Sequence, residues 1–351
     1  MTDRAARTIE KGDLVCVTGA SGFIGAHVVD ALLSAGYAVR ATVRDADDDS
    51  KTAQLRNLDG ADERLEIVSA DLMKPGSFDD AVADCPYVCH VAASVKLRAK
   101  DPQREIVDVA VKGTHNVLDS IDKAGVARRV VMTSSIAAIV DETKSSDFVH
   151  DESCWNESST LEESPYPLAK ARSEKAAWER HEKLDPADRY GFVTVNPTLV
   201  LGPVLAKVHV RSSPAIIRDL MAGKFPMIPN FRFGVVDVRD VALAHVRALE
   251  RADASGRHLL NAEGAWLTEL AKIVRDAYPD AKVPRFRMPD PLMYVVALFD
   301  KRLSWSFLRR NLGNVTQYDN GKSKSSLGLA YRTLDDTLRA TAQSFVDLGL
   351  L

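Results

Sequence analysis

The sequence predicts an α/β fold in which a doubly wound parallel sheet is followed by a smaller, mostly helical part. Two observations carry this prediction. In the first half of the chain, short apolar runs alternate with segments of helical spacing, a pattern typical of βαβ units. After Gly202 the pattern loosens, because Pro203, Pro214, Pro226 and Pro229 interrupt it.

The expected elements follow in chain order. The first strand is Leu14–Thr18, and the helix Phe23–Ser34 comes after it. Further strands are expected at Val39–Val43, Leu65–Ser69, Val88–Val91, Arg129–Thr133 and Phe192–Asn196. Helices are expected at Ser77–Ala83, Gln103–Lys123 and Tyr166–Lys183, and one late apolar segment at His258–Leu260. The acidic run Asp47–Asp49 is interpreted as a solvated loop.

Composition narrows the function classes. The 351 residues include 46 basic and 49 acidic side chains, so the net charge is −3 and no basic surplus favours nucleic-acid binding. The longest late apolar run, Pro291–Phe299, is far shorter than the ~20 residues of a membrane span. The polar start of the chain does not resemble a secretory signal. We expect a cytoplasmic protein without a nucleic-acid or membrane partner.

The four cysteines, Cys16, Cys85, Cys89 and Cys154, form no CxxC pair and no cluster at zinc spacing. Free thiols in a reducing compartment are therefore expected, and no metal site is predicted. The predicted organisation is a polar N-terminal extension (1–12), a nucleotide-binding domain (13–201) and a substrate-binding part (202–351). A segment of about 235–262 is expected to return to the nucleotide-binding domain.

The strongest local motif is VTGASGFIGAHVV, in which three glycines follow the first strand and open the first helix. Bare backbone at such a turn can approach a pyrophosphate, whose charge is stabilised by the helix N-terminus. The spacing is GxxGxxG rather than GxGxxG, but the strand before it and the helix after it favour dinucleotide binding in a Rossmann-type domain. The loop residues predicted to bind the cofactor are Gly19, Ser21, Gly22, Phe23, Ile24 and Gly25.

The second strand indicates which dinucleotide is bound. An NAD site usually has Asp or Glu about 20 residues after the glycines. This chain has Arg44 there, with Lys51 seven residues further on. Guanidinium and ammonium groups suit a 2′-phosphate, so NADPH (NADP+) is favoured. The adjacent Asp45 weakens the inference, and a solvated surface arginine is the alternative.

Tyr166 and Lys170 form a YxxxK pair within one predicted helix, which places both on the same face. A lysine ammonium beside a phenol favours phenolate and is expected to lower the tyrosine pKa, as general acid–base catalysis requires. Ser135 follows the strand Arg129–Thr133, at the edge where ligands of open α/β sheets bind. Its hydroxyl can hydrogen bond a substrate carbonyl oxygen.

Together these motifs resemble the extended short-chain dehydrogenase/reductase family. The resemblance is to the branch of dihydroflavonol reductases, cinnamoyl-CoA reductases and related aldehyde or ketone reductases. It extends over nearly the whole chain and includes VRATVRD, HVAA, VMTSS, DESCW, SEKAAWE, NPTLVLGP and VDVRDVALAH. DESCW and the AAW after Lys170 are the most branch-specific of these motifs.

The resemblance implies a role for each matching residue. Tyr166 would be the general acid, Lys170 its activator and a ribose ligand, and Ser135 the carbonyl-polarising hydroxyl. Arg44 and Lys51 would hold the 2′-phosphate. The other residues implied to border the cofactor are Asp71 and Leu72 at the adenine, Val91, Ala92 and Ala93 along the cleft, and Pro197, Thr198, Leu199 and Val200 beside the nicotinamide.

Three departures from the family pattern bear on the substrate. Val140 stands where plant dihydroflavonol reductases have a polar residue that contacts the flavonoid ring, which argues against a dihydroflavonol. SPYPLAK replaces the NWYCYGK of cinnamoyl-CoA reductases, which argues against a CoA thioester. Ala110 occupies a helix position where many members have an asparagine that anchors a proton-relay water.

The favoured function is an NADPH-dependent reductase of an aldehyde or ketone, with hydride from the nicotinamide and a proton from Tyr166. The alternatives are a hydroxysteroid dehydrogenase or nucleotide-sugar epimerase/dehydratase on the same fold, and an NADP-sensing binding protein. The partner is expected to be a small-molecule carbonyl substrate, with the chain a monomer or homodimer. Candidate pocket walls are Val204, Leu205, His209, Phe225, Met227, Phe231 and Phe233.

Overall fold

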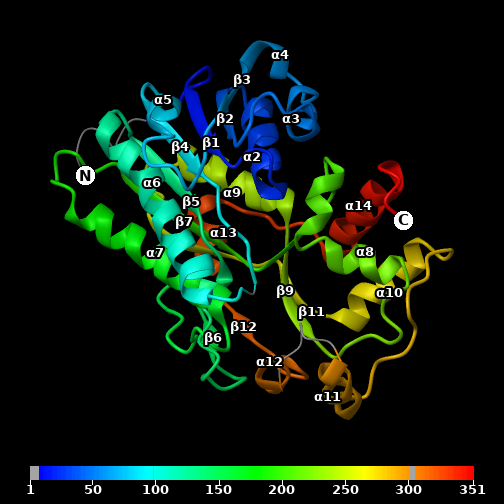
Figure 1. Ribbon diagram of the computed structural model, residues 1–351. Helices are drawn as coiled ribbons and strands as arrows, with labels where there is room; N and C mark the ends of the chain where they lie inside the picture. Colours follow the sequence, from blue (N-terminus) through cyan, green and yellow to red (C-terminus); the bar gives the residue numbers. More distant parts are fainter. Residues whose placement is uncertain (1–7, 98, 300–304) are drawn as a thin grey trace.

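A seven-stranded sheet forms the centre of the protein (Figure 1). The computed structural model describes residues 8–97, 99–299 and 305–351. Within them the strand order is β10-β7-β5-β4-β1-β2-β3, and every neighbouring pair is parallel. The order reverses between β1 and β4, so a crevice opens at the carboxyl ends of these two strands. The predicted doubly wound Rossmann-type fold is confirmed.

The strands of this sheet are β1 (Leu14–Thr18), β2 (Ala38–Val43), β3 (Leu65–Ser69), β4 (Tyr87–His90), β5 (Arg129–Thr133), β7 (Gly191–Pro197) and β10 (Gly256–Leu260). The connecting helices are α2 (Phe23–Ser34), α3 (Asp49–Arg56), α4 (Ala61–Arg64), α5 (Asp79–Val82), α6 (Asp108–Ala124), α7 (Pro165–Lys183) and α9 (Val238–Glu250). Strands β1, β3 and β5 and helix α2 have the predicted bounds. The other predicted strands and helices differ by one or a few residues at one or both ends, and α3, α4 and α9 were not predicted.

Helices cover both faces of the sheet (Figure 1). Helices α2 and α9 pack against each other on one face, and α6 and α7 pack against each other on the opposite face. Strands β1, β4, β5 and β7 lie between these layers, and their side chains are almost entirely buried. Such strands bury apolar side chains on both faces, which is why they appear in the sequence as continuous apolar runs rather than alternating ones.

The C-terminal part contains more strand than expected. Strands β8 (Leu199–Leu201), β9 (Arg232–Asp237) and β11 (Glu263–Trp266) form a second sheet in the order β11-β9-β8. A short pair joins β6 (Val149–His150) to β12 (Gln317–Tyr318). The remaining helices are α8 (Ala215–Met221), α10 (Leu267–Ala277), α11 (Asp290–Phe299), α12 (Trp305–Asn311), α13 (Gly321–Leu327) and α14 (Leu334–Asp347).

Two local expectations need correction. The acidic run is not simply a loop, because the Asp48 side chain accepts a hydrogen bond from the Ser50 N–H and caps α3, which begins at Asp49. The helix expected over Gln103–Lys123 begins with a wider turn, η1 (Gln103–Val107), before α6. Two other short turns are η2 (Ile136–Ala138) and η3 (Lys207–Arg211).

The four cysteines are free thiols, as expected. Among the described helices, none has both the length and the apolar character that crossing a bilayer would require.

Candidate active site

The glycine loop packs against the chain that leaves β4. Gly19 has a φ of +69°, and a Cβ built on it would lie 2.7 Å from the Cα of Ala92. A Cβ on Gly25 would lie 2.2 Å from the Gly19 carbonyl oxygen, so no side chain fits at either position without a shift of backbone. Gly22 is the N-cap of α2 and offers no side chain to its first N–H groups. The helix N-terminus is therefore open to an anionic ligand.

Thr18, the last residue of β1, connects this loop to the end of β4. Its hydroxyl oxygen accepts hydrogen bonds from the N–H groups of Val91 (3.1 Å) and Ala92 (3.0 Å). The same oxygen lies 2.9 Å from Nδ1 of His90, to which its proton is available. Burial lowers the pKa of His90 to about 3, so its ring is neutral. These contacts hold the predicted cleft residues Val91 and Ala92 beside the glycine loop.

The three residues predicted to be catalytic lie at the carboxyl edge of the sheet. Ser135 follows β5 and caps η2, with its hydroxyl accepting a hydrogen bond from the Ala137 N–H (3.2 Å). Tyr166 and Lys170 lie in the first turns of α7, which packs against η2. The Ser135 side chain is a hydrogen-bonding neighbour of Tyr166. Strand β5 and helix α7 thus bring the three residues together.

The electrostatics differ from the expectation at Tyr166. Burial raises the pKa of Tyr166, and the hydrogen bond with Ser135 only partly opposes this rise. The expected lowering by Lys170 is therefore not what governs this phenol. Burial lowers the pKa of Lys170 to about 8, with the carboxylate of Glu174 acting in the opposite direction. At neutral pH the phenol is accordingly protonated and the lysine is mostly charged.

A pocket opens next to Tyr166 and Lys170. Half of the residues that line it are aliphatic or Met, namely Leu72, Ala92, Ala93, Ala110, Met132 and Ala169. Hydroxyl groups complete it, from Ser94, Thr114, Thr133 and Ser173. Thr114 on α6 and Ser173 on α7 hydrogen bond each other at 2.7 Å. Ala110, where a relay asparagine is common, lines this same pocket.

The residues predicted to bind the adenosine part of the cofactor lie after the ends of β2 and β3. Arg44 is exposed directly after β2. Lys51, on α3, forms an ion pair with Asp48, so its ammonium group is already engaged. Asp71 accepts a hydrogen bond from the Met73 N–H (2.9 Å) and shapes the turn that presents Leu72 to the pocket.

Pro197, Thr198, Leu199 and Val200 lie where the chain passes from β7 to β8. The Thr198 N–H donates to the Leu260 carbonyl at 3.0 Å, which fixes this crossing beside the end of β10. Within the loop at β1, the Ser21 carbonyl accepts a hydrogen bond from His209 Nε2 (3.2 Å), Phe23 is buried, and Ile24 packs on the core. All predicted loop residues thus surround one helix start.

The C-terminal candidates for pocket walls are placed differently. His209 contacts the glycine loop, while Val204 and Phe231 are buried in hydrophobic clusters. Leu205, Phe225, Met227 and Phe233 pack against those clusters. Within the described part of the chain, the residues around the pocket at Tyr166 include none of these seven.

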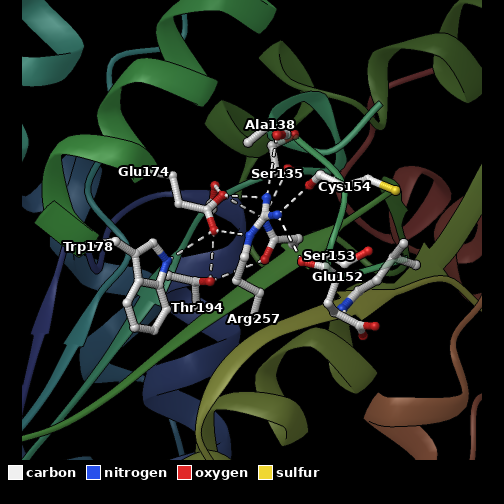
Figure 2. Close-up of polar contacts among 12 residues, drawn as sticks. Ser135, Ala138, Glu152, Ser153, Cys154, Glu174, Trp178, Thr194 and Arg257 are labelled. Atoms are coloured by element: carbon white, nitrogen blue, oxygen red, sulfur yellow. Dashed lines mark hydrogen bonds and ion pairs between the residues drawn. The ribbon is translucent and has the colours of Figure 1, made fainter. Parts of the chain in front are cut away.

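Sequence reasoning missed a buried network under the site. Glu174 on α7 and Arg257 on β10 form an ion pair with a 2.7 Å contact, and the two side chains are 0% and 8% exposed. Figure 2 shows how residues of several elements converge on this pair. The available signal was spacing, because Glu174 follows Lys170 by four residues and so shares its helix face.

Comparisons with known proteins show the family to which the chain is related. The model of the 3-beta hydroxysteroid dehydrogenase/isomerase family matches residues 16–262. Cinnamoyl-CoA reductase CAD2 of Medicago truncatula is 39% identical over 337 residues, which is 95% of either chain. A bifunctional dihydroflavonol 4-reductase/flavanone 4-reductase of Malus domestica is 34% identical over 306 residues, which is 84% of either chain.

A solved structure is also similar along its whole length. Yeast methylglyoxal/isovaleraldehyde reductase Gre2, crystallised with NADPH, superposes with a TM-score of 0.79 at 29% identity. The match covers 96% of this chain and 100% of the yeast chain. The resemblance predicted from the motifs is therefore confirmed. The chain belongs to the 3-beta hydroxysteroid dehydrogenase/isomerase family, within the extended short-chain dehydrogenases/reductases, and is an oxidoreductase.

Proposed function

We propose that this protein is an NADPH-dependent reductase that converts a hydrophobic aldehyde or ketone to the alcohol. The observation that carries the proposal is the meeting of Ser135, Tyr166 and Lys170 beside a partly apolar pocket at the carboxyl edge of the sheet. The similarity to carbonyl reductases along the whole chain supports the same reaction class.

The residues present fit a dinucleotide. The crowded cradle at Gly19 and Gly25 leaves backbone alone to face a pyrophosphate, and the uncapped start of α2 supplies N–H donors. Arg44 would bind the 2′-phosphate, with Lys51 as a second cation, and Asp71, Leu72 and the Val91–Ala93 segment would border the adenine and the cleft. Pro197–Val200 would flank the nicotinamide. Gre2 bound to NADPH supports this choice of cofactor.

NADPH, when bound, supplies the hydride. The protein's own residues act on the carbonyl oxygen. The Ser135 hydroxyl donates a hydrogen bond to it, and Tyr166 delivers the proton that completes the alcohol. Because burial raises the pKa of Tyr166, the phenol carries this proton at neutral pH. The Lys170 ammonium stabilises the phenolate that is left and binds the ribose.

The pocket residues that are not assigned to the cofactor include Ala110, Met132 and Ala169, and their apolar side chains support a hydrophobic substrate. Each methylene buried against this wall contributes about 0.8 kcal/mol, whereas an unpaired sugar hydroxyl would cost about 1–3 kcal/mol. SPYPLAK at residues 164–170 argues against a CoA thioester, and Val140 against a dihydroflavonol, although both are named among the relatives. Isovaleraldehyde, one of the two carbonyl compounds named for Gre2, is a small apolar aldehyde that suits the same wall.

One alternative keeps a specific observation in its favour. The matching family model is named after 3-beta hydroxysteroid dehydrogenases, and a hydroxysteroid or ketosteroid is also a hydrophobic alcohol or ketone. A hydroxysteroid dehydrogenase is therefore the alternative. An epimerase or dehydratase of nucleotide sugars is less favoured, because Arg44 stands where an acidic residue is expected for NAD. A sensor without chemistry is less favoured because Tyr166 and Lys170 are both retained.

NADPH oxidation measured against matched pairs of carbonyls tests the proposal. We expect the highest kcat/KM with hydrophobic aldehydes or ketones, and lower values for hydroxylated counterparts, dihydroflavonols, cinnamoyl-CoA and UDP-sugars. Faster turnover of a UDP-sugar or a dihydroflavonol would refute the substrate class, and a steroid as best substrate would favour the alternative.

Tyr166→Phe is the matched test of chemistry. It should bind NADPH normally, because the ring remains, but lose about 10²–10⁴-fold in kcat. Tyr278→Phe is the control, because Tyr278 bonds Gln343 on α14 and is not one of the residues that line the pocket. A Tyr166→Phe enzyme with more than a tenth of wild-type kcat would remove Tyr166 from the role of acid.

A further inference from the structure

The carboxylate of Glu174 is surrounded by donors from several elements. It is fully buried, and Figure 2 shows it facing Arg257. Its donors are Ser134 Oγ at 2.5 Å, Asn196 Nδ2 at 2.7 Å, Arg257 Nε at 2.7 Å, Thr194 Oγ1 at 2.9 Å, Arg257 Nη2 at 3.3 Å and Trp178 Nε1 at 3.4 Å. The two oxygens therefore accept bonds from β7, β10, α7 and Ser134, the residue that follows β5.

Arg257 also contacts several other groups besides Glu174. Its guanidinium lies 3.7 Å from the Trp155 ring centroid and donates to the carbonyl of Glu152 (3.0 Å), and also to that of Cys154. A further bond reaches the carbonyl of Ala138 at 3.3 Å. Burying such a pair is costly, and well-packed apolar residues often replace one without loss of stability. A role beyond stability is therefore worth seeking.

The network joins the two halves of the catalytic constellation. Asn196 Nδ2 bonds both Glu174 and the carbonyl of Ser135 (3.2 Å). Ser134, which precedes Ser135, bonds Glu174, and Ala138, which ends the turn that Ser135 caps, bonds Arg257. Glu174 itself stands one helical turn from Lys170 on α7. One carboxylate thus links the Ser135 turn to the helix that carries Tyr166 and Lys170.

The charges around Lys170 are few. On its own helix it faces Tyr166 and Glu174, and from β4 it faces His90, which burial keeps neutral. Around Glu174, β7 contributes uncharged Thr194 and Asn196, the residue after β5 contributes uncharged Ser134, and β10 contributes Arg257. Of these groups, Glu174 is the one whose negative charge favours the protonated form of Lys170.

We propose that Glu174 is a positioning residue that holds the Ser135 turn against the part of α7 that carries Tyr166 and Lys170, with Arg257 as the partner that makes its burial possible. This inference rests on the proposed function, because it assigns Glu174 an effect through the two residues that act on the carbonyl and its proton donor. It predicts a change in the pH dependence of turnover, which a purely structural pair would not cause.

The test removes the charge of Glu174 without leaving the charge of Arg257 buried and unpaired. Glu174→Gln alone leaves Arg257 buried without its partner, so it is expected to be less stable. The double variant Glu174→Gln/Arg257→Met removes both charges and keeps an apolar chain against Trp155. Glu179→Gln makes the same change at an exposed position of α7 and is the matched control. Cooperative unfolding and NADPH affinity within about threefold of wild type establish that a variant is folded.

The readout is kcat against pH with the best carbonyl substrate. In the wild type we expect an alkaline limb from loss of the Lys170 proton. The double variant should move this limb down by about one pH unit, which by itself lowers kcat at pH 7 by less than about twofold. A larger loss of kcat is expected only from displacement of the Ser135 turn. Glu174→Asp keeps the charge but shortens the reach to Ser134 and Asn196, so it should lower kcat and leave the limb in place.

The outcomes separate the two proposals. A folded double variant with the wild-type limb and kcat would overturn the role of Glu174 and leave the reductase assignment intact. A wild-type protein that binds NADPH but reduces no carbonyl of the panel would overturn the proposed function itself. The Glu179→Gln control should match the wild type throughout.

Discussion

Thr18 illustrates how much of the site depends on single side chains. Its one hydroxyl accepts two backbone N–H groups after β4 and contacts the neutral ring of His90. Nothing in the sequence distinguishes this threonine from any other residue that ends a strand. Its role depends on the parallel pairing of β1 with β4, which brings Thr18 opposite His90.

Tyr166 gives the opposite lesson. Its spacing from Lys170 was sufficient to predict that both share a helix face, but not the direction of its pKa. The ammonium was expected to dominate, whereas burial under the pocket wall raises the pKa of the phenol. Desolvation depends on every atom around a group, so it is decided by packing rather than by spacing.

Arg44 carries the prediction on cofactor choice. Arg44→Asp should shift the preference from NADPH toward NADH, because a charge-assisted bond worth about 1.5–3 kcal/mol is lost and repulsion replaces it. Lys51→Ala should have a smaller effect, because Lys51 already pairs with Asp48. The measurement is kcat/KM for both cofactors in the wild type and the two variants. A wild type that uses NADH as well as NADPH would show that Arg44 does not read the phosphate.

At the scale of elements, the glycine loop and α2 form the most predictable unit. The strand, the three glycines and the helix lie where the pattern indicates, since the information is local and each glycine has a steric reason. Gly19 combines a left-handed backbone with close approach to Ala92. A side chain there would push the loop away from β4.

Gly19→Ala tests that reason with Gly125→Ala as its control. Both glycines have φ near +65° to +69°, but a Cβ on Gly125 meets nothing within 4 Å. Both variants should lose about 1 kcal/mol for the left-handed backbone. Gly19→Ala should lose at least another 1 kcal/mol to the clash and bind NADPH at least tenfold more weakly. Urea unfolding and fluorescence titration measure both quantities, and equal losses in the two variants would contradict the packing argument.

Elements of the C-terminal part were less predictable. Strand β9 pairs with β8 in parallel and with β11 antiparallel, and all three strands are short. Such strands are stabilised by partners distant in the chain rather than by local preference. Strand β10 pairs with β7 in the main sheet, although it follows β8 and β9 of the second sheet in the chain. The division of the chain near residue 201 remains our proposal.

For the whole molecule, buried histidines couple stability to pH. Burial lowers the pKa of His90 to about 3 and those of His209, His245 and His258 to about 4, from an ordinary value of 6.5. The unfolded chain therefore binds protons in a range where the folded rings stay neutral. The stability these rings contribute is full above pH 6.5 and is lost as the pH falls toward 4.

We expect the free energy of unfolding to fall steeply between pH 6.5 and 4. A ring whose pKa is 6.5 in the unfolded chain and about 4 in the folded protein accounts for about 3 kcal/mol of the total decrease in the free energy of unfolding. His245→Gln should reduce the slope, because it removes a fully buried ring bonded to Thr133. Urea unfolding of the wild type and of this variant at several pH values is the measurement, and equal slopes in both proteins would refute the coupling.

The sequence by itself determined the main sheet, the glycine cradle and the pairing of Tyr166 with Lys170 on one helix. These features depend on neighbours a few residues apart, whose apolar runs, glycines and helical spacing can be read directly. Only the tertiary structure decided which residues from distant parts of the chain contact these features. It brings Arg257 to Glu174 across 83 residues, buries Tyr166, and places Phe231 and Phe233 in or against a hydrophobic cluster rather than around the pocket. The physical reason is that pairing and desolvation are set by distant segments, whose meeting depends on how the whole chain packs.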